Sequence, residues 1–356
     1  MASPVHTYFY SMVEVGVVKF FVDHQIFHAI PHEENTSIAY DELAAKSGVD
    51  LPLLERFLNF LIAAKLFTAP SLRHVAHTES SKIFMRDDAS YFYQHAFDYF
   101  FVSAARWPEY FEENGPAEPK LANRAPYGLA AGFPDKTLYD ILEMMPRKAA
   151  IFNATMAMTL AEMPAIGTYD FGWIANYIAE MDSKTGEQRK ILVDVGGGQG
   201  QILKAILEKA TYIPPDRCVL EDQSEHAVNK DKAGVMSTVK RQVANFFEEQ
   251  PVKGALVYHV SRVLNDWPDE ACVGILGRLR EACAPDSRVL VAENLLPDDP
   301  SQTIELCAID LFMMNFGGKR RTQEHYAHLA SRAGFRMSTI SHDEKSKFGV
   351  IEMVPL

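Results

Sequence analysis

Residues 191–203 carry the feature that most constrains the fold of this chain: an apolar strand that runs into a glycine-rich turn and then into the start of a helix. The strand is Ile191-Leu192-Val193-Asp194-Val195, and the turn is Gly196-Gly197-Gly198-Gln199-Gly200. Glycines remove side chains, so a ligand can approach the backbone and the N-terminus of the following helix closely. The pattern therefore predicts a strand-turn-helix unit with a ligand at the turn. It does not match a dinucleotide fingerprint, because Gln201 stands where the last glycine belongs.

Strand and helix patterns alternate through the rest of the second half. Short apolar strands are predicted at 191–195, 218–220, 255–260 and 288–293, separated by helical patterns. Such alternation is typical of a mostly parallel sheet with helices on both faces, so we predict an α/β fold with a Rossmann-like domain. Two further strand candidates, 336–340 and 349–353, are joined by a short polar turn, and we expect them to form an antiparallel hairpin at the edge of the sheet.

The first half of the chain has helical periodicity instead. Apolar residues recur at three- and four-residue spacing within 12–21 and 51–62. Between them, one short helix is predicted to end at Gly48 and a second to begin at an Asp50 cap, which is a helix-turn-helix pattern. The second helix carries few basic residues, so packing or dimerisation is favoured over DNA binding. A polar stretch at 181–190 predicts the boundary between two domains, 1–180 and 181–356.

The composition limits the possible partners. The chain has 356 residues, with 35 Lys plus Arg against 47 Asp plus Glu, so its formal charge is −12. Phosphate contacts need a surplus of Lys and Arg, and a nucleic-acid partner is therefore not expected. The four cysteines have no CxxC spacing, which argues against a metal site and a disulfide framework. No apolar run of about 18 residues and no signal peptide is evident, so we expect a cytoplasmic protein without membrane association.

An acidic pair follows the second strand of the α/β half. Leu220-Glu221-Asp222 lies where the ribose of an adenosine would sit, and a carboxylate accepts hydrogen bonds from two hydroxyls. The glycine turn and this acid together predict an adenosine ligand. They leave open whether the ligand is a dinucleotide or S-adenosylmethionine (SAM).

Four segments, in this order, carry a resemblance to a known family: Asp194-Val195-Gly196-Gly197-Gly198-Gln199-Gly200, Asn265-Asp266-Trp267-Pro268-Asp269-Glu270, Glu293-Asn294-Leu295-Leu296-Pro297 and Gly317-Gly318-Lys319-Arg320-Arg321-Thr322. They resemble the SAM-dependent class I O-methyltransferases that act on small molecules in plants and fungi, and most of all the branch of fungal secondary metabolism. The resemblance covers nearly the whole chain, including a winged-helix-like N-terminal dimerisation domain. It implies a homodimer with a deep apolar pocket for a small natural product.

Position by position, the resemblance implies contacts to SAM or S-adenosylhomocysteine from Gly196, Gly198, Asp222, Asn245, Phe246 and Ser261. The two glycines would lie against the methionine part of the cofactor, and Asp222 would hold the ribose hydroxyls. Asn245 stands where the family usually has an Asp at the adenine, and its amide can still hydrogen-bond the adenine amino group. Ser261 stands where relatives often carry Lys or Arg against the cofactor.

The resemblance breaks at the catalytic positions. Members that methylate phenols use a histidine directly before Asp-Trp as general base, because the hydroxyl must lose its proton as it attacks the methyl group. Here that position is Asn265, followed by Asp266. Of the two glutamates that orient the histidine, Glu293 matches the first, but Arg320 replaces the second. An amide has no useful basicity and a guanidinium stays protonated, so the inherited base is missing.

Three interpretations follow. The favoured one retains the fold and SAM for a dehydration or pericyclic cyclisation, as in methyltransferase-like pericyclases of the leporin type, with Asn265 and Arg320 donating to a carbonyl that gains negative charge. The second retains methyl transfer to an acidic hydroxyl or an ionised enol carbon, with His259 or His95 as a substitute base. In the third, the chain is a non-catalytic partner subunit, Asn265 is a helix cap and Arg320 is a surface charge.

Large apolar side chains are the candidates for the substrate pocket. The run 91–101 is aromatic on all sides and is predicted to be buried or to line an apolar pocket, with His95 as a polar member that needs a partner. The other candidates, for which core packing is the alternative, are Phe100, Phe152, Met156, Phe312, Met313 and Phe316. They imply an apolar, ring-containing substrate and nothing finer.

Overall fold

The computed structural model describes residues 3–162, 169–185, 189–297, 303–342 and 348–356. The chain forms two compact units, Met1–Val102 with Met145–Met158, and Ser103–Met144 with Thr159–Leu356. The predicted boundary at residue 181 falls inside helix α12 (Trp173–Thr185), whose Tyr177 and Ile178 pack against the core of the second unit. None of the described helices is long and apolar enough to cross a membrane.

The first unit is mostly helical, as its periodicity predicts. Its elements are α1 (Pro4–Asp23), α2 (Ile26–Ala29), β1 (Ile38–Ala39), α3 (Tyr40–Ser47), α4 (Leu51–Ala63), β2 (Phe67–Thr68), β3 (His74–His77), α5 (Glu79–Lys82), the short 3-10 helix η1 (Ile83–Met85), α6 (Asp87–His95), the π-helix η2 (Ala96–Phe101) and α11 (Pro146–Glu162). The short strands pair antiparallel in the order β1-β3-β2. Gly48 ends α3 in the left-handed conformation as expected, but the Asp50 side chain makes no capping hydrogen bond to α4.

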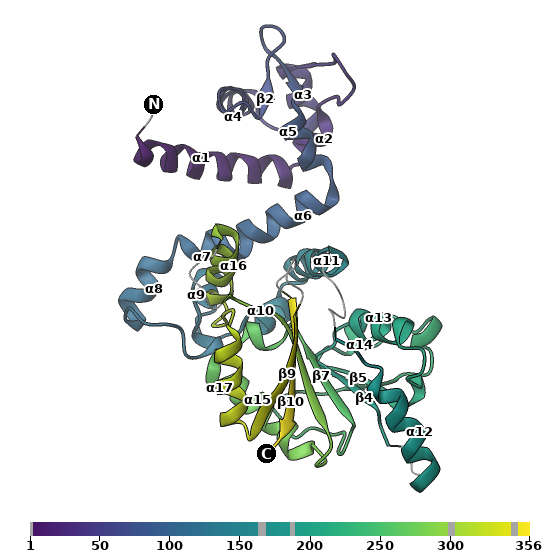
Figure 1. The fold of residues 1–356 in the computed structure, drawn as a ribbon. Coiled ribbons are helices and arrows are strands. Elements are labelled where there is room, and N and C mark those ends of the chain that lie inside the picture. Colours follow the sequence, from purple (N-terminus) through teal and green to yellow (C-terminus); the bar gives the residue numbers. More distant parts are fainter. Residues whose placement is uncertain (1–2, 163–168, 186–188, 298–302, 343–347) are drawn as a thin grey trace. The chain divides into compact units, whose positions relative to one another are not determined.

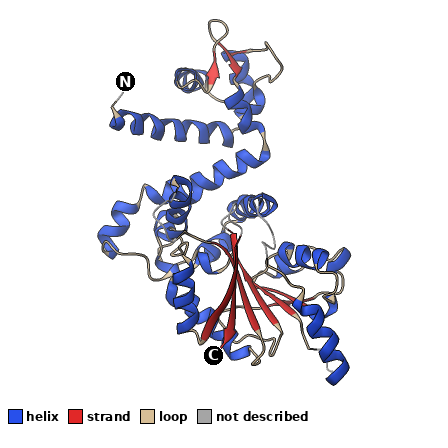
Figure 2. Cartoon of the chain, viewed as in Figure 1, coloured by secondary structure: helices blue, strands red, loops and turns tan. Residues whose placement is uncertain are grey.

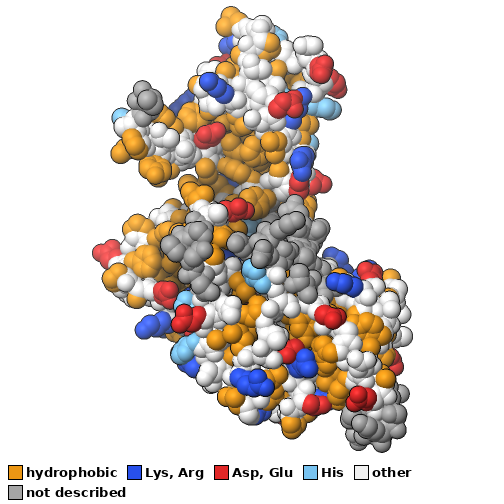
Figure 3. Space-filling view, viewed as in Figure 1, with side chains coloured by type: hydrophobic (Ala, Val, Ile, Leu, Met, Phe, Trp, Pro, Cys, Tyr) orange, Lys and Arg blue, Asp and Glu red, His pale blue; other side chains and the backbone are white. Residues whose placement is uncertain are grey.

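Apolar side chains of the first unit are buried only in part. The N-terminal half of α1 exposes several large ones, which Figure 3 shows gathered along this helix: Val5, Tyr8, Phe9, Tyr10 and Met12. In the aromatic run 91–101, His95 and Tyr99 are buried, whereas Phe92 is 64% exposed. The expected burial therefore holds for one side of this run only. The predicted role of this unit in dimerisation stays a prediction.

The second unit contains the predicted Rossmann-like sheet. Its strands are β4 (Leu192–Val195), β5 (Cys218–Asp222), β6 (Lys240–Val243), β7 (Val257–Ser261), β8 (Arg288–Asn294), β9 (Phe335–His342) and β10 (Phe348–Pro355). They lie in the order β6-β5-β4-β7-β8-β10-β9, and all pairs from β6 to β8 are parallel. The expected hairpin is present, since β10 pairs antiparallel with both β8 and the edge strand β9. Figure 2 shows these strands as one twisted sheet.

Helices cover both faces of this sheet (Figure 1). On one face, α15 (Asp269–Ala282) and α17 (Gln323–Arg332) pack on Val193, Tyr258 and Val291, and on the other α12 and α13 (Gln201–Lys209) pack on Leu192 and Leu220. The remaining helices of the unit are α8 (Trp107–Asn114), α9 (Pro126–Ala130), α10 (Leu138–Met144), α14 (Glu225–Val228) and α16 (Ile304–Met314). Because the strand order reverses at β4, a crevice for a ligand is expected outside its carboxyl end.

Candidate active site

The glycine turn lies at the carboxyl end of β4, where the strand order reverses. Gly196 has a φ of +69°, and a Cβ at this position would lie 2.9 Å from Cγ2 of Val263, so a side chain is excluded on both grounds. A Cβ on Gly198 would meet no protein atom within 4 Å. The backbone of the turn is therefore tightly packed at Gly196 and open at Gly198, which leaves room for a ligand before α13.

Asp222 lies across from the glycine turn, at the end of β5. Its Oδ2 accepts a hydrogen bond from the Gly198 N–H at 3.0 Å and its Oδ1 accepts one from the Ser224 N–H at 2.9 Å. The neighbouring Glu221 points into the core, where Gln242 and Gln250 donate to its carboxylate at 2.6 and 2.8 Å. Of the two acids, Asp222 is therefore the one that faces the turn and can hold two ribose hydroxyls.

The remaining predicted cofactor residues lie around the same crevice. Asn245 is held by its own loop, since its Oδ1 accepts from the Phe247 N–H at 3.1 Å and its Nδ2 donates to Glu248 at 3.3 Å. The ring of Phe246 lies 3.4 Å from the Cβ position of Gly196. At the end of β7, the buried Oγ of Ser261 has no hydrogen-bond partner among the described residues. An adenosine ligand with its own hydroxyls and amino groups fits this set of donors and acceptors.

His259, one of the two candidate substitute bases, is occupied elsewhere. Its Nδ1 lies 3.2 Å from Oδ1 of Asp194, the residue that pairs with it across β4 and β7, and only 1% of the histidine is exposed. This pair sits beneath the glycine turn, where a Cβ on Gly197 would collide with the Asp194 carboxylate. His259 therefore braces the turn and does not reach a substrate.

Asn265 and Asp266 form a short helical turn, η6 (Leu264–Asp266), after β7. The Asn265 N–H donates to Oε1 of Glu293 at 3.3 Å, and its Nδ2 donates to Oδ1 of Asp266 at 3.1 Å. The hydroxyl of Tyr139, from α10, donates to Oδ2 of Asp266 at 2.6 Å, and its ring stacks on Trp267. The Asn265 side chain is thus not the cap of a helix, and one of its two amide hydrogens is used to hold the half-buried Asp266 carboxylate.

Burial makes two carboxyl groups hard to ionise here, that of Asp266 in the turn and that of Glu293 on β8. Burial, followed by the nearby charge of Asp266, raises the pKa of Glu293 to about 7. Burial also raises the pKa of Asp266 to about 6, against the hydrogen bond from Tyr139 and the charges of Arg262 and Arg320, which lower it. Near neutral pH, this site therefore holds a partly protonated pair of carboxyl groups.

Arg320 lies in this site and is not a surface charge. Only 9% of the residue is exposed, and its backbone N–H donates to Oδ1 of Asp310 at 2.7 Å. Its Nε has no hydrogen-bond partner among the residues that the structure describes. The interpretation of Arg320 as a solvent-exposed charge is therefore wrong, because the surrounding chain buries the residue.

Three residues of this site were not predicted from the sequence. Arg321 is fully buried and donates to Asp269 and to the carbonyl oxygens of Leu264 and Trp267 at 2.7 to 2.8 Å, so it fixes the turn that carries Asn265. The other two are Gly318, where a Cβ would lie 2.1 Å from the Asn265 carbonyl oxygen, and Arg262, which follows β7 with a φ of +56°. Gly318 and Arg321 stood within a recognised motif, but only the folded chain shows what they touch.

The pocket candidates fall into both units. In the second, Phe316 is 4% exposed and packs edge-on against Tyr127, while Phe312 lies 5.3 Å from it and Met313 is half-buried. Asn315 between them accepts a hydrogen bond from the Trp107 indole. Phe316 is therefore buried against Tyr127, and the pocket role of Phe312, Met313 and Phe316 stays a prediction.

In the first unit, His95 lies 4.8 Å from the ring of Tyr99 and 5.6 Å from that of Phe152, and it is 5% exposed. Burial lowers the pKa of His95 to about 4, so the ring is neutral near pH 7. Phe100 and Met156 are half-buried on the same unit. A π-helix directly follows His95, and such irregular turns are frequent at functional sites.

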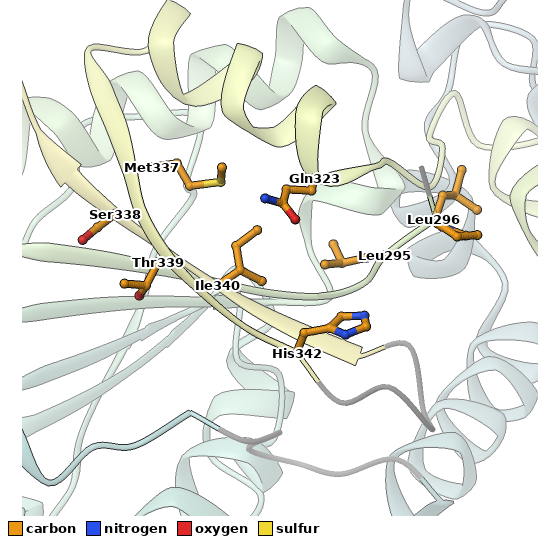
Figure 4. Close-up of a pocket in the computed structure, with 9 residues that line it drawn as sticks. Leu295, Leu296, Gln323, Met337, Ser338, Thr339, Ile340 and His342 are labelled. Atoms are coloured by element: carbon orange, nitrogen blue, oxygen red, sulfur yellow. The ribbon is translucent and has the colours of Figure 1, made fainter. Parts of the chain in front are cut away.

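A separate cavity of about 470 Å³ lies beside the edge strand β9 (Figure 4). It is lined by Leu295, Leu296, Pro297, Gln323, Met337, Ser338, Thr339, Ile340 and His342. None of the predicted cofactor, catalytic or substrate-pocket residues lines it.

Comparison with known proteins identifies relatives over the full length. Residues 178–336 match the model of the O-methyltransferase domain. The chain is 51% identical to the methyltransferase fsa4 of Fusarium sp. (strain FN080326), over 99% of this chain and 96% of the relative. OxaC, solved with S-adenosylhomocysteine and oxaline, shares the fold with a TM-score of 0.85 at 23% identity, over 98% of this chain and 87% of OxaC. A solved pericyclic reaction enzyme shares it with a TM-score of 0.74 at 20% identity, over 100% and 90% of the two chains.

Proposed function

Because the chain belongs to the SAM-dependent O-methyltransferase family, in its branch of fungal secondary metabolism, we propose that it transfers a methyl group from SAM to an acidic group of a small natural product. The observation that carries this proposal is the 51% identity, over nearly all of both chains, to a protein named a methyltransferase. At 20% identity, the likeness to a pericyclic reaction enzyme supports the fold alone.

The cofactor crevice supports the proposal. Asp222 would hold the ribose hydroxyls, the open backbone at Gly198 would face the methionine part, and the Ser261 hydroxyl would gain the partner that it lacks in the chain. Bound SAM supplies an electrophilic methyl group on a positively charged sulfur. The contribution of the chain is to hold the acceptor next to that position and to exclude water.

The missing histidine restricts the acceptor to groups that lose a proton readily. Asn265 is committed to Asp266, and His259 to Asp194, so neither removes a proton from a weakly acidic phenol. Two guanidinium groups, of Arg262 and Arg320, face two carboxyl groups that are partly neutral near pH 7. The two guanidinium groups therefore place positive charge beside carboxyl groups that burial makes harder to ionise, and this favours an acceptor in its anionic form.

The direct test is the incubation of purified protein with SAM and a panel of phenols and enolised 1,3-dicarbonyl compounds. We expect equal amounts of S-adenosylhomocysteine and methylated product, measured by liquid chromatography with mass spectrometry, from the more acidic members. An Asp222→Asn variant is the control for dependence on the cofactor site. Failure to form S-adenosylhomocysteine with any acidic acceptor, by protein that binds SAM, would reject methyl transfer.

A non-methylating reaction is the second candidate, and the unpaired Nε of Arg320 is what favours it. A guanidinium that donates to a carbonyl stabilises negative charge that develops there during a dehydration or cyclisation. In that case the protein would accelerate ring closure of a polyketide-type alcohol in the presence of SAM, without forming S-adenosylhomocysteine. The homodimer, the cytoplasmic location and a pocket role for His95 stay predictions.

A further inference from the structure

Several buried polar side-chain atoms in the second unit lack hydrogen-bond partners among the described residues, and two of them have opposite requirements. Oε2 of Glu293 is an acceptor when the carboxyl group is ionised, and the residue is fully buried. Nε of Arg320 is a donor, in a residue that is 9% exposed. Unpaired buried polar groups are costly, so a pair of them in one place indicates a site that a ligand completes.

Contacts along the chain place these two atoms in one site. The Asn265 N–H binds the other oxygen of Glu293, and the Asn265 carbonyl oxygen would lie 2.1 Å from a Cβ on Gly318, two residues before Arg320. The charge of Arg320 acts on both Glu293 and Asp266. Nevertheless, among the described residues no ion pair within 4.0 Å joins Arg320 to Glu293, so Nε of the first and Oε2 of the second each lack a partner.

From this arrangement, and resting on the proposed methyl transfer, we infer that the acceptor substrate is a vinylogous acid, held by Glu293 and Arg320 at two points. Such a molecule carries an acidic hydroxyl or N–H conjugated with a carbonyl group. The acidic heteroatom shares one proton with Oε2 of Glu293, and the carbonyl oxygen accepts a hydrogen bond from Nε of Arg320. Both unpaired atoms are thereby satisfied by one planar ligand group.

The proton balance follows from the same contact. The lone pair of the heteroatom forms the new bond to the methyl carbon, the bond from that carbon to sulfur breaks with its electron pair to sulfur, and the shared proton remains on Glu293. A group with a pKa near the working pH suits this step, and that of Glu293 is about 7. The titratable and charged groups that face Glu293 come from the loop after β7, from α15, from the loop before α17 and from α17. They are Arg262, Asp266, Cys272, Arg320 and Tyr326.

Binding without turnover tests this inference. We would measure by calorimetry the affinity of the full chain for 2-acetylcyclohexane-1,3-dione, a vinylogous acid, and for its methyl enol ether, which has no acidic proton. The dione is expected to bind at least about tenfold more tightly than the ether. Arg320→Gln should weaken binding of the dione about tenfold or more, as loss of a hydrogen bond to a charged group does. Arg336→Gln, on the exposed edge strand, is the matched control.

The pH dependence separates the two contact points. Binding of the ionised dione should weaken as the pH rises above about 7, because Glu293 then loses the proton that it shares. Glu293→Gln should remove this dependence, because its amide does not titrate, and the exposed Glu324→Gln should retain it. If Arg320→Gln does not fold, as judged by its thermal transition, Arg320→Lys retains the charge without the Nε donor and should show the same loss.

The inference is overturned if wild-type protein does not bind the dione, if it binds the ether equally well, if the arginine variants bind as the wild type does, or if Glu293→Gln retains the pH dependence. These outcomes are independent of the proposed function. Tight, pH-dependent binding without methylation would reject methyl transfer alone, and methylation without these binding effects would reject only the two-point site.

Discussion

Arg321 is the side chain on which the geometry of the candidate active site most depends. It is fully buried between the turn at residues 264–267 and the start of α15, and its guanidinium donates to Asp269 and to two backbone carbonyl oxygens of the turn. Arg321→Lys retains the positive charge but replaces a planar fork of donors by a single ammonium group. We expect it to loosen the turn that carries Asn265 and Asp266.

The contacts set the size of the effect. Lysine can retain the ion pair with Asp269, but it cannot reach both carbonyl oxygens in the same geometry, and each lost bond from a charged donor to a buried acceptor costs about 1.5 to 3 kcal/mol. The free energy of unfolding should therefore fall by about 2 to 4 kcal/mol. Arg332→Lys is the matched control, because Arg332 makes a two-point ion pair with Glu270 at the surface, where such pairs contribute about 0 to 1 kcal/mol.

Urea unfolding followed by tryptophan fluorescence measures this difference, since Trp267 lies in the affected turn. The turnover number should fall with Arg321→Lys while the dissociation constant of SAM changes less than about twofold, because the predicted cofactor residues lie at or after the ends of β4, β5, β6 and β7, outside the turn at residues 264–267. If the two lysine variants unfold at the same urea concentration, or if only SAM binding is weakened, the assignment of Arg321 to this turn is refuted.

Three further outcomes follow from the geometry. Asp222→Asn should weaken SAM binding about tenfold or more in calorimetry, by removing a charged acceptor for hydroxyls, whereas the exposed Asp216→Asn should not. Burial raises the pKa of Glu293 from 4.5 to about 7 in the folded state, so folding takes up a proton at this residue. The free energy of unfolding should therefore fall as the pH rises between these two values. Glu293→Gln, measured by urea titration, should lack this part of the decrease. Tyr139→Phe removes a donor that lowers the pKa of Asp266, so that pKa should rise above about 6, and carboxyl NMR titration that finds it unchanged would contradict the contact.

The regular elements of the second unit were largely predictable. Buried parallel strands are continuous apolar runs, so β4, β5, β7 and β8 were found within a few residues of their bounds. Strand β6 was missed, because its sequence Lys240-Arg241-Gln242-Val243 is polar and only partly buried at the edge of the sheet. The prediction for the aromatic run 91–101 was wrong in the opposite direction, since Phe92 is largely exposed although the sequence of the run indicates burial.

The candidate active site was predictable only where a motif is local. Gly196, Gly198 and Asp222 were placed from the strand-turn-helix pattern and its neighbouring strand, and the structure brings them together by a backbone hydrogen bond. Tyr139 is a different case, because it reaches Asp266 from 127 residues away. No spacing in the sequence marks such a contact, since it depends on which helix packs over which turn.

The sequence by itself determined that this chain builds a parallel α/β sheet with a cofactor crevice, and that the histidine base of its family is replaced by Asn265. Local backbone preferences and strand periodicity are sufficient for the first statement, whereas the second rests on the resemblance of the four motifs to the family. Only the tertiary structure decided that Arg320 is buried, that Asn265 holds Asp266, and that Glu293 lacks a partner on one oxygen. Burial and hydrogen-bond pairing arise where distant segments meet, and they determine how strongly each charged group interacts and which of them can act on a substrate.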